Sequence, residues 1–279
     1  MNVFHFLAKQ VISFFVLCFG IEQWIKLVNL IPGISANTRR RLILSPKATE
    51  NIRCLDYLGL SYYSNVHDTS NKLARLSFQS WEQQSRNFFF ELSKNSDLVL
   101  DVGAHSGIYS LIAASSSSTS RIIAFEPNPT MRVIMQKNVE LNGFSSRIAI
   151  QEFALSNSGG FSTLTIGNDT SMAVLTSISN MEVPSAHLEV EVKTARLDDF
   201  SFDADSMLIK VDIEGSEIAF LHGALQTILT FKPIILMEAL TDLDLQLQFT
   251  FLSNLGYEPP VCMGFDTGDE RNYLWRISK

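Results

Sequence analysis

Short apolar runs alternate with segments of helical periodicity over residues 98–255. The apolar runs, which contain many β-branched residues, cover residues 98–102, 121–125, 147–153, 207–213 and 234–237. The helical segments cover residues 106–114, 130–141, 216–229 and 242–255. Because this alternation is typical of a parallel sheet with helices on both faces, the sequence predicts a doubly wound α/β domain.

The alternation is interrupted between the third and fourth apolar runs and again near the C-terminus. Residues 161–166 and 188–194 are expected to form an antiparallel excursion around the loop 167–186. Residues 257–262 and 272–277 are predicted to form a hairpin joined through the glycine-containing segment 264–268. The predicted sheet is therefore mostly, but not wholly, parallel.

Composition narrows the functional classes. Lys and Arg number 22 against 29 Asp and Glu, so the 279 residues carry a net charge of −7. An acidic surface repels phosphate backbones, so nucleic acid is not an expected partner. Cys18, Cys54 and Cys262 are scattered, with neither metal-ligand spacing nor a disulfide framework, which favours a reducing, cytoplasmic location.

Residues 1–35 are predicted to form an apolar N-terminal helix. Its uncharged core from Val11 to Ile21 is shorter than the roughly 20 residues that span a bilayer. Such a helix could pack on the domain or on a second subunit. Alternatively, residues 3–31 could lie in a membrane surface, with Arg39-Arg40-Arg41 meeting anionic lipid, which would make the protein peripheral to the membrane. Both interpretations stay open, as does the oligomeric state.

Residues 36–80 are weakly patterned, and we expect a helical or irregular cap there. Helical spacing returns at residues 80–92, where Trp81, Phe88 and Leu92 can share one apolar face. The main domain is therefore placed at residues 81–279.

The first predicted strand leads into a turn with glycines at both ends, Gly103-Ala104-His105-Ser106-Gly107. In a parallel sheet, ligands bind beyond the carboxyl ends of the strands, and such glycines let the backbone approach a ligand closely. Glu126 stands at the end of the second strand, where a carboxylate can accept both hydroxyl protons of a ribose. The two features together indicate a cofactor that contains a nucleoside.

The turn also indicates which cofactor. Its Gly-x-x-x-Gly spacing lacks the pyrophosphate fingerprint of nicotinamide cofactors. Asp101 would repel a pyrophosphate but suits an ammonium, and S-adenosylmethionine has an ammonium, a ribose and no phosphate. Asp101 could instead only cap the following helix. The candidate cofactor-binding residues are Asp101, Gly103, Ala104, His105, Gly107, Glu126, Asn128 and Phe153.

A charged cluster follows the fourth apolar run. Strand alternation puts Lys210, Asp212 and Glu214 on one side if the strand continues that far. Two carboxylates and an ammonium in a cleft can keep one carboxylate ionised and raise the pKa of the other. We predict that Asp212 is the base or orients the acceptor, with Glu214 and Lys210 as further catalytic candidates.

Other interpretations of this cluster stay open. Lys210 could only neutralise Asp212, and Glu214 and Glu217 could be favoured by the dipole of the following helix. Asp212 and Glu214 could also hold Mg²⁺, but acid–base work is the preferred interpretation and no metal site is predicted. Glu238, at the end of the fifth strand, is a candidate for contact with the substrate, or a cap of the next helix.

Six segments in this order resemble methyltransferases of the FkbM type, which depend on S-adenosylmethionine. The segments are DVGAHSGIYS at 101–110, AFEPNP at 124–129, NVELN at 138–142, TARLDDF at 194–200, LIKVDIEGSE at 208–217 and PIILME at 233–238. The resemblance covers roughly residues 80–279. It implies the seven-stranded class I methyltransferase fold and transfer of a methyl group, usually to a hydroxyl oxygen of a sugar, glycolipid or polyketide.

The resemblance also implies that Asp101, Gly103, Gly107 and Glu126 bind the cofactor. One position departs from the pattern, because His105 stands where the family usually has Asn. We therefore expect an O-methyltransferase that acts on a small molecule, a glycan or a lipid-linked acceptor. The alternatives are an NAD-dependent oxidoreductase, which the incomplete fingerprint disfavours, a nucleotide-sugar transferase, and a scaffold that binds the cofactor without catalysis.

Overall fold

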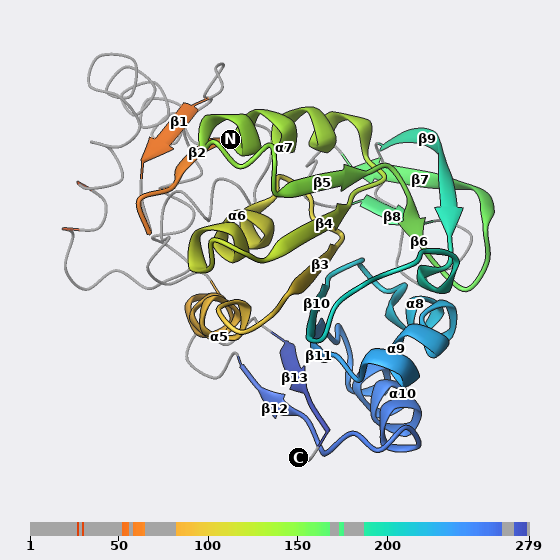
Figure 1. Ribbon diagram of the computed structural model, residues 1–279. Coiled ribbons are helices and arrows are strands. Elements are labelled where there is room, and N and C mark those ends of the chain that lie inside the picture. The colour runs from red at the N-terminus through yellow and green to blue at the C-terminus, as the bar shows by residue number, and fades with distance from the viewer. Residues whose placement is uncertain are drawn as a thin grey trace.

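The computed structural model describes residues 52–55, 58–64, 82–167, 173–175, 187–263 and 271–277, together with Leu27 and Leu30. A seven-stranded sheet in the order β12-β13-β11-β10-β3-β4-β5 forms its centre (Figure 1). The strands are β3 (Leu98–Val102), β4 (Arg121–Phe125), β5 (Ile148–Gln151), β10 (Met207–Val211), β11 (Ile234–Glu238), β12 (Val261–Cys262) and β13 (Asn272–Trp275). The prediction of a doubly wound, mostly parallel seven-stranded sheet is confirmed.

The strand order creates a switch point between β3 and β10. From β3 the chain adds β4 and β5 on one side, and then returns to add β10 and β11 on the other. All these neighbours are parallel, whereas β13 runs antiparallel to both β11 and β12, as the predicted hairpin requires. Ligands of such sheets bind beyond the carboxyl ends at the switch point.

In the described part of the chain, three helices cover each face of the sheet (Figure 1). They are α5 (Gln83–Ser93), α6 (Ile108–Ser116) and α7 (Pro129–Leu141) on one face, and α8 (Glu217–Gly223), α9 (Leu225–Phe231) and α10 (Asp242–Ser253) on the other. Successive strand residues supply opposite cores: Val99 packs with α5, α6 and α7, whereas Leu98 and Leu100 pack with α8, α9 and α10. A strand buried on both faces explains why β3 has no polar alternation.

The predicted antiparallel excursion is confirmed as a second sheet in the order β6-β9-β7-β8. Its strands are β6 (Ala154–Leu155), β7 (Gly160–Gly167), β8 (Ala173–Leu175) and β9 (His187–Ala195). A short 3-10 helix, η1 (Leu197–Asp199), leads back toward β10. The second sheet lies beside the carboxyl ends of β4 and β5 (Figure 1), and so beside the switch point.

The expectation of a helical or irregular cap at 36–80 is wrong for the described residues of that range. There β1 (Ile52–Leu55) and β2 (Ser61–Ser64) form an antiparallel hairpin, and β2 lies against α7 (Figure 1). The contacts that hold it come from helix side chains far along the chain, which local periodicity cannot reveal.

Three further expectations are corrected by the packing. The predicted helix 216–229 is interrupted at Ala224 and gives α8 and α9. Gly223, just before the break, lies so close to the second sheet that a Cβ would sit 1.9 Å from the carbonyl oxygen of Ser156. The strand predicted for 207–213 ends at Val211. Among the described apolar side chains of α5, Phe89 is the fully buried one, whereas Phe88 is 48% exposed, and Trp81 lies outside the described residues.

Most of the predicted N-terminal helix at 1–35 lies outside the described residues. Leu27 and Leu30 are described, and both side chains are exposed. In the part of the chain that the structure covers, no helix combines the length and the apolar character needed to cross a bilayer.

Candidate active site

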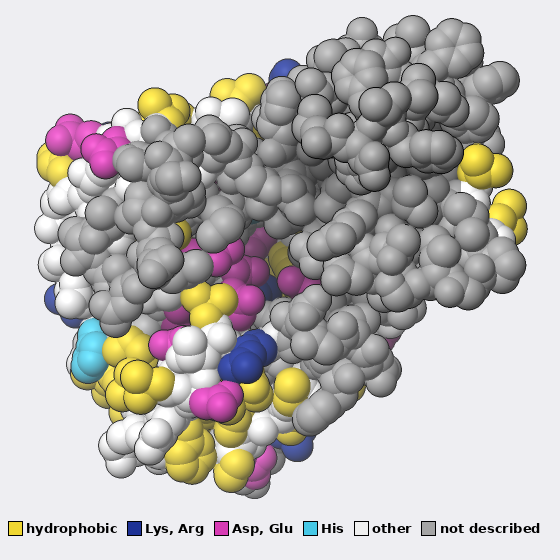
Figure 2. All heavy atoms as spheres, turned by 180° about the vertical axis from the view of Figure 1, so that it is seen from behind, with side chains coloured by type: hydrophobic (Ala, Val, Ile, Leu, Met, Phe, Trp, Pro, Cys, Tyr) yellow, Lys and Arg dark blue, Asp and Glu magenta, His cyan; other side chains and the backbone are white. Residues whose placement is uncertain are grey.

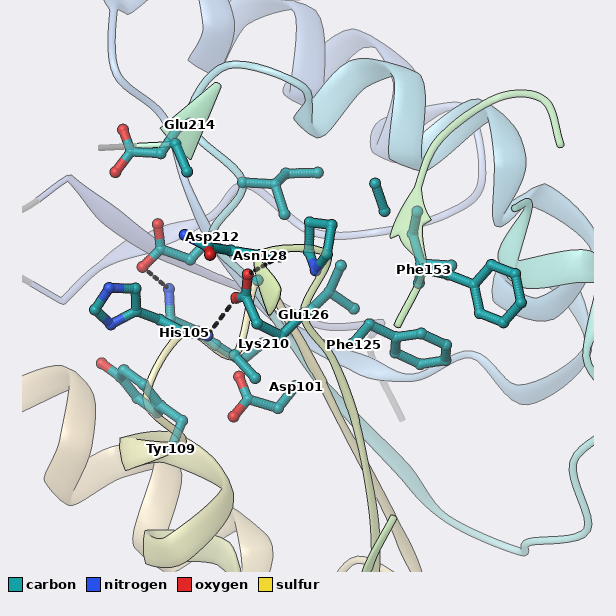
Figure 3. Close-up of a pocket in the computed structure, with 18 of the residues that line it drawn as sticks. Asp101, His105, Tyr109, Phe125, Glu126, Asn128, Phe153, Lys210, Asp212 and Glu214 are labelled. Atoms are coloured by element: carbon teal, nitrogen blue, oxygen red, sulfur yellow. Dashed lines mark hydrogen bonds and ion pairs between the residues drawn. The ribbon is translucent and has the colours of Figure 1, made fainter. Parts of the chain in front are cut away.

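A cavity opens at the switch point, beyond the carboxyl ends of β3, β4 and β10 (Figure 3). All the cofactor-binding candidates line it except Gly107, which closes the turn, and so do the catalytic candidates Lys210, Asp212 and Glu214. The substrate candidate Glu238 ends the neighbouring strand β11 and is half-buried. The tertiary structure therefore brings together two motifs that are about 110 residues apart in the chain.

The turn after β3 needs glycine at its start. Gly103 has φ of 79°, and a Cβ there would lie 1.8 Å from the carbonyl oxygen of Asp212. The N–H groups of Gly103 and Ala104 both donate to the carbonyl oxygen of Phe125, at 2.9 and 3.1 Å. The turn is therefore held against β4 on one side and against the start of the charged cluster on the other.

His105 occupies a left-handed backbone conformation, with φ of 53°. Asn, Asp and His are the residues other than glycine that adopt this region most readily. The backbone therefore explains why His can replace Asn here. The same conformation directs the N–H of His105 to Oε2 of Glu126, at 2.6 Å.

The Glu126 carboxylate is fixed by the main chain. Oε2 accepts from His105, and Oε1 accepts from the N–H of Asn128 at 2.7 Å (Figure 3). Burial raises the pKa of Glu126, while the charge of His105 and the two N–H groups act in the opposite direction. Both oxygens are thus oriented in the cavity wall, and each keeps a lone pair for a further donor.

The side-chain amide of Asn128 uses its oxygen in a hydrogen bond, whereas its nitrogen is a buried donor. Oδ1 accepts from the N–H of Thr130 at 3.0 Å and so caps α7. Nδ2 is buried and has no hydrogen-bond partner among the residues that the structure describes. Because an unpaired buried donor is costly, this amide fits a ligand that offers an acceptor in the cavity.

Asp101 does cap the following helix, as the alternative interpretation holds, but with one oxygen. Oδ2 accepts from the N–H of Ser110 at 2.9 Å and from its hydroxyl at 2.6 Å. Burial raises the pKa of Asp101 to about 6, although the Ser110 hydrogen bonds and the Lys210 charge lower it. Since both bonds end on Oδ2, Oδ1 is left for an ammonium in the cavity.

Lys210 is fully buried and lies directly beside Asp101 in the parallel register of β3 and β10. Its ammonium donates to Oδ1 of Asn272 at 2.9 Å and to Oδ2 of Asp212 at 3.2 Å, and lies 5.1 Å from the centre of the Tyr109 ring. Burial alone would lower the pKa of Lys210, but the nearby carboxylates, Asp212 foremost, outweigh it and raise that pKa. The cluster therefore contains one firmly held ion pair.

Three further carboxyl groups near this ion pair, those of Glu214, Glu217 and Glu238, have pKa values above the usual value of a Glu side chain. Burial, reinforced by Asp212 and Glu217, raises the pKa of Glu214 to about 8. Burial raises the pKa of Glu217 to about 7, and its Oε1 accepts from the N–H groups of Ile213 and Gly215, so Glu217 shapes the loop before α8. Burial and the Asp212 charge raise the pKa of Glu238 well above its usual range. Asp212 is the carboxylate of the cluster that forms the ion pair with Lys210.

The capping role considered for Glu238 belongs to another residue, because Thr241 caps α10. Glu214 continues the cluster only through a left-handed backbone conformation, with φ of 52°, after β10 has ended. Among the residues that the structure describes, no three His, Cys, Asp or Glu side chains are placed to hold a metal ion.

Comparison with known proteins identifies the family. The family model described as Methyltransferase FkbM domain matches residues 101–259, more than half of the chain. The chain belongs to the FkbM methyltransferase family. The matched residues include all the site residues expected from the sequence: the glycine turn, Glu126, the charged cluster and Glu238.

The relatives are distant. Methyltransferase 1 of Beauveria bassiana (strain ARSEF 2860) is 29% identical over 143 residues, which are 45% of this chain and 57% of the relative. The chain thus matches little more than half the length of that protein. Methyltransferase FkbM from Methylobacillus flagellatus KT has a TM-score of 0.46 and 19% identity, over 77% of this chain and 56% of that one. Precorrin-6y C5,15-methyltransferase from Geobacter metallireducens GS-15 has a TM-score of 0.45 and 16% identity, over 71% and 89%.

Two residues of this FkbM methyltransferase site are missing from the sequence-based candidates. Asn272 reaches Lys210 because β13 pairs with β11 and places it opposite Glu238. Tyr109 donates its hydroxyl proton to Oε2 of Glu82 at 2.6 Å and presents its ring to Lys210. Tyr109 lies within the glycine-turn motif, and Asn272 begins a predicted strand. The sequence could therefore have suggested either residue as a candidate. Their contacts with Lys210, however, become visible only in the folded structure.

The far wall of the cavity is apolar. Leu164 and Leu175 of the second sheet line it, together with Phe153. The Phe153 ring points away from the carboxylates (Figure 3) and packs edge-on against Phe200, with centroids 5.7 Å apart. This wall offers an apolar surface for a flat ring beside the polar end of the FkbM methyltransferase site.

Proposed function

We propose that this FkbM methyltransferase transfers a methyl group from S-adenosylmethionine to a hydroxyl oxygen of a sugar, glycolipid or natural product. The observation that carries the proposal is the Glu126 carboxylate, fixed by two N–H groups in a cavity that it shares with Asp101 and Asp212. The cofactor's ribose and ammonium and the acceptor hydroxyl each need a carboxylate, and the cavity has one for each.

The described residues fit this cofactor. In the proposal, Asp101 accepts from the ammonium through Oδ1, and Glu126 accepts from the ribose hydroxyls. Asn128 supplies the unpaired donor Nδ2, and the absence of a side chain at Gly103 lets the ligand approach the turn. When bound, S-adenosylmethionine supplies a methyl group on a sulfonium.

Asp212 is proposed to orient the acceptor hydroxyl and to take its proton. Its side chain is 32% exposed, whereas that of its partner Lys210 is buried, so the carboxylate reaches the cavity while its charge is balanced from behind. The pKa of Glu214 is raised to about 8, which favours the protonated carboxyl that can donate a hydrogen bond to the acceptor. Burial and the Asp212 charge raise the pKa of Glu238 in the same direction.

The charge of the cluster favours a neutral hydroxyl as the acceptor. Figure 2 shows acidic side chains gathered in a hollow of the molecular surface. The Lys210 ammonium in the cavity wall is already paired with Asp212, and Glu214 lies beside it. Lys210 is the one Lys or Arg among the described residues that line the cavity, so a phosphate or carboxylate at the reacting position would find no free cationic side chain of this kind, and neither is proposed as the methylated group.

Calorimetry on one sample with S-adenosylhomocysteine, S-adenosylmethionine and NAD tests cofactor binding. We expect both adenosyl compounds to bind and NAD not to bind. Glu126→Gln should weaken S-adenosylhomocysteine binding by about tenfold or more, because one carboxylate oxygen that accepts from the ribose or the turn becomes an amide NH₂ group that cannot accept. Glu140→Gln, an exposed change on α7, is the matched control. Binding of NAD alone would refute the proposal.

Methyl transfer can be followed with a tritiated methyl group and a panel of neutral sugars, lipid-linked sugars and hydroxylated natural products. A methyl ether survives mild alkali, whereas a methyl ester does not, so alkali-stable label supports transfer to a hydroxyl. Asp212→Asn should lower turnover about 100-fold or more while S-adenosylhomocysteine affinity is kept. Asp242→Asn, at a 96% exposed side chain, is the control. Full turnover of Asp212→Asn would remove this residue from the mechanism.

A lipid-linked acceptor further requires that residues 3–31 meet a membrane surface, which we propose as the peripheral alternative. Flotation of the full-length chain with vesicles of neutral and anionic lipid tests it. Binding that depends on anionic lipid is expected. A chain that stays at the bottom of both gradients would leave only acceptors that are not membrane-bound.

A further inference from the structure

Two asparagine side chains, Asn138 of α7 and its C-cap residue Asn142, bind strand β2 as a neighbouring strand would. Asn142 accepts from the N–H of Ser61 at 2.8 Å and donates to its carbonyl oxygen at 2.7 Å. Asn138 does the same to Tyr63, at 2.6 and 3.0 Å. Four residues of a helix advance about 6 Å, and two residues of a strand advance about 6.7 Å, so the two amides match alternate residues of β2.

The same strand also reaches the turn of the proposed cofactor site. Nδ2 of Asn138 donates to the carbonyl oxygen of Ser106 at 2.9 Å. Tyr62, which lies on β2 between the two residues held by the amides, forms a hydrogen bond through its hydroxyl with Oγ of Ser106. The Tyr62, Ser106 and Asn138 side chains are all buried, so water does not replace these bonds readily.

From Ser106 the connection continues to the cofactor-binding groups. Oγ of Ser106 lies 3.2 Å from Nδ1 of His105, and the N–H of His105 donates to the Glu126 carboxylate. Ser106 and His105 both line the cavity. A displacement of β2 would therefore act on the turn through two side chains, and on Glu126 through the turn.

We propose that Tyr62 is a positioning residue for the cofactor turn, so that docking of the β1–β2 hairpin and binding of the cofactor stabilise each other. The inference rests on the proposed use of S-adenosylmethionine. Tyr62 does not line the cavity. It acts by holding Ser106, and with it His105, in the left-handed turn that the ligand requires.

The size of the effect follows from population arithmetic. If the turn adopts its binding conformation only part of the time, the observed affinity falls by that fraction. One neutral hydrogen bond changes such an equilibrium by about fivefold. Removing the Tyr62 hydroxyl should therefore weaken cofactor binding by up to about fivefold. The bound state reorders the turn, so turnover at saturating cofactor should stay within about twofold.

The test compares Tyr62→Phe with Tyr63→Phe in the full-length protein, with S-adenosylhomocysteine as the probe. Both variants lose one hydroxyl from β2. The Tyr63 ring, however, lies 4.9 Å from the Lys137 ammonium on the outer side of α7, and Phe keeps that contact. We expect about three- to fivefold weaker binding for Tyr62→Phe and unchanged binding for Tyr63→Phe. Equal affinity of both variants and the parent would overturn the inference.

A double-mutant cycle separates positioning from general destabilisation. Ser106→Ala removes the other end of the same bond, so Tyr62→Phe should add little to it in the double variant. Additive losses would mean that Tyr62 acts elsewhere and would also overturn the inference. A rise in KM for S-adenosylmethionine at constant kcat supports positioning, whereas a fall in kcat alone contradicts it.

The outcomes separate the two levels of the argument. If the parent chain binds no S-adenosylhomocysteine, the proposed function fails and this inference fails with it. If the parent binds and Tyr62→Phe binds equally well, only the inference fails. Hydrogen exchange of residues 103–107 gives a second readout, because Tyr62→Phe should speed exchange there in the free protein and not in the complex.

Discussion

Gly103→Ala is the substitution for which the structure predicts the largest effect from the smallest chemical change. The added methyl group would lie 1.8 Å from the carbonyl oxygen and 2.8 Å from the carbonyl carbon of Asp212. Ordinary contact begins at 3.4 Å, so one side must move by roughly 3.4 − 1.8 = 1.6 Å. The Asp212 backbone cannot yield freely, because its N–H donates to the carbonyl oxygen of Val102 at 3.0 Å.

The expected cost has two parts. Alanine in a left-handed conformation costs about 1–2 kcal/mol. Forcing the turn away from the end of β10 adds about 1–3 kcal/mol, as in other overpacked interiors. Gly143→Ala is the matched control, because Gly143 has φ of 71° and no atom of the described residues lies within 4 Å of the added Cβ. It should show the first cost alone.

Urea denaturation, with thermal melting beside it, measures both variants. Gly143→Ala should lose about 1–2 kcal/mol of unfolding free energy, and Gly103→Ala about 2–5 kcal/mol. Calorimetry with S-adenosylhomocysteine should show about tenfold or weaker binding for Gly103→Ala, because a shift of this size spoils the ligand geometry, and unchanged binding for the control. Equal stability losses with intact binding in both variants would refute the claim that the turn and Asp212 are pressed together.

Three further outcomes follow from the charged groups. Because the pKa of Asp101 is about 6 and its ionised form binds the ammonium, affinity for S-adenosylmethionine should fall about tenfold per pH unit below 6, and Asp101→Asn should abolish that limb in calorimetry from pH 5 to 7.5. Lys210→Met leaves Asp212 without its partner and should cost about 3 kcal/mol in urea denaturation; a loss below about 1 kcal/mol would contradict the buried pair. The pKa of Glu214 is raised to about 8, so the folded state binds its proton more tightly than the unfolded state and stability should fall as pH rises from about 4.5 to 8. Glu214→Gln should reduce the pH dependence of the unfolding free energy over that window, measured by urea denaturation, by up to about 1.4 kcal/mol per pH unit.

The central strands and the turn could be predicted because their signals are local. β3 is apolar throughout since it is buried on both faces, and Gly103 and Gly107 stand where φ is positive. Lys210 and Asp212 are two residues apart at the end of a predicted strand, which places their side chains on the same side. The structure contains this ion pair, although β10 ends at Val211, one residue before Asp212.

The errors lie where a contact comes from elsewhere in the chain. No periodicity marks the β1–β2 hairpin, because its strands are held by Asn138 and Asn142 about 80 residues later. Helical periodicity continues across Ala224, but the helix is interrupted there, next to the close approach of Gly223 to Ser156. Asn272 reached the site only through the register of β13.

Residue order alone was enough to specify a doubly wound sheet, a glycine turn and an acidic residue after the second strand, since burial and backbone conformation act over a few neighbouring residues. The different electrostatic environments of the site carboxylates could be recognised only in the folded structure. Asp212 is paired with a buried ammonium 3.2 Å away, whereas burial and the nearness of Asp212 raise the pKa values of Glu214 and Glu238. Electrostatic energies depend on distance through space and on solvent exclusion, and neither quantity is written in the spacing of residues along the chain.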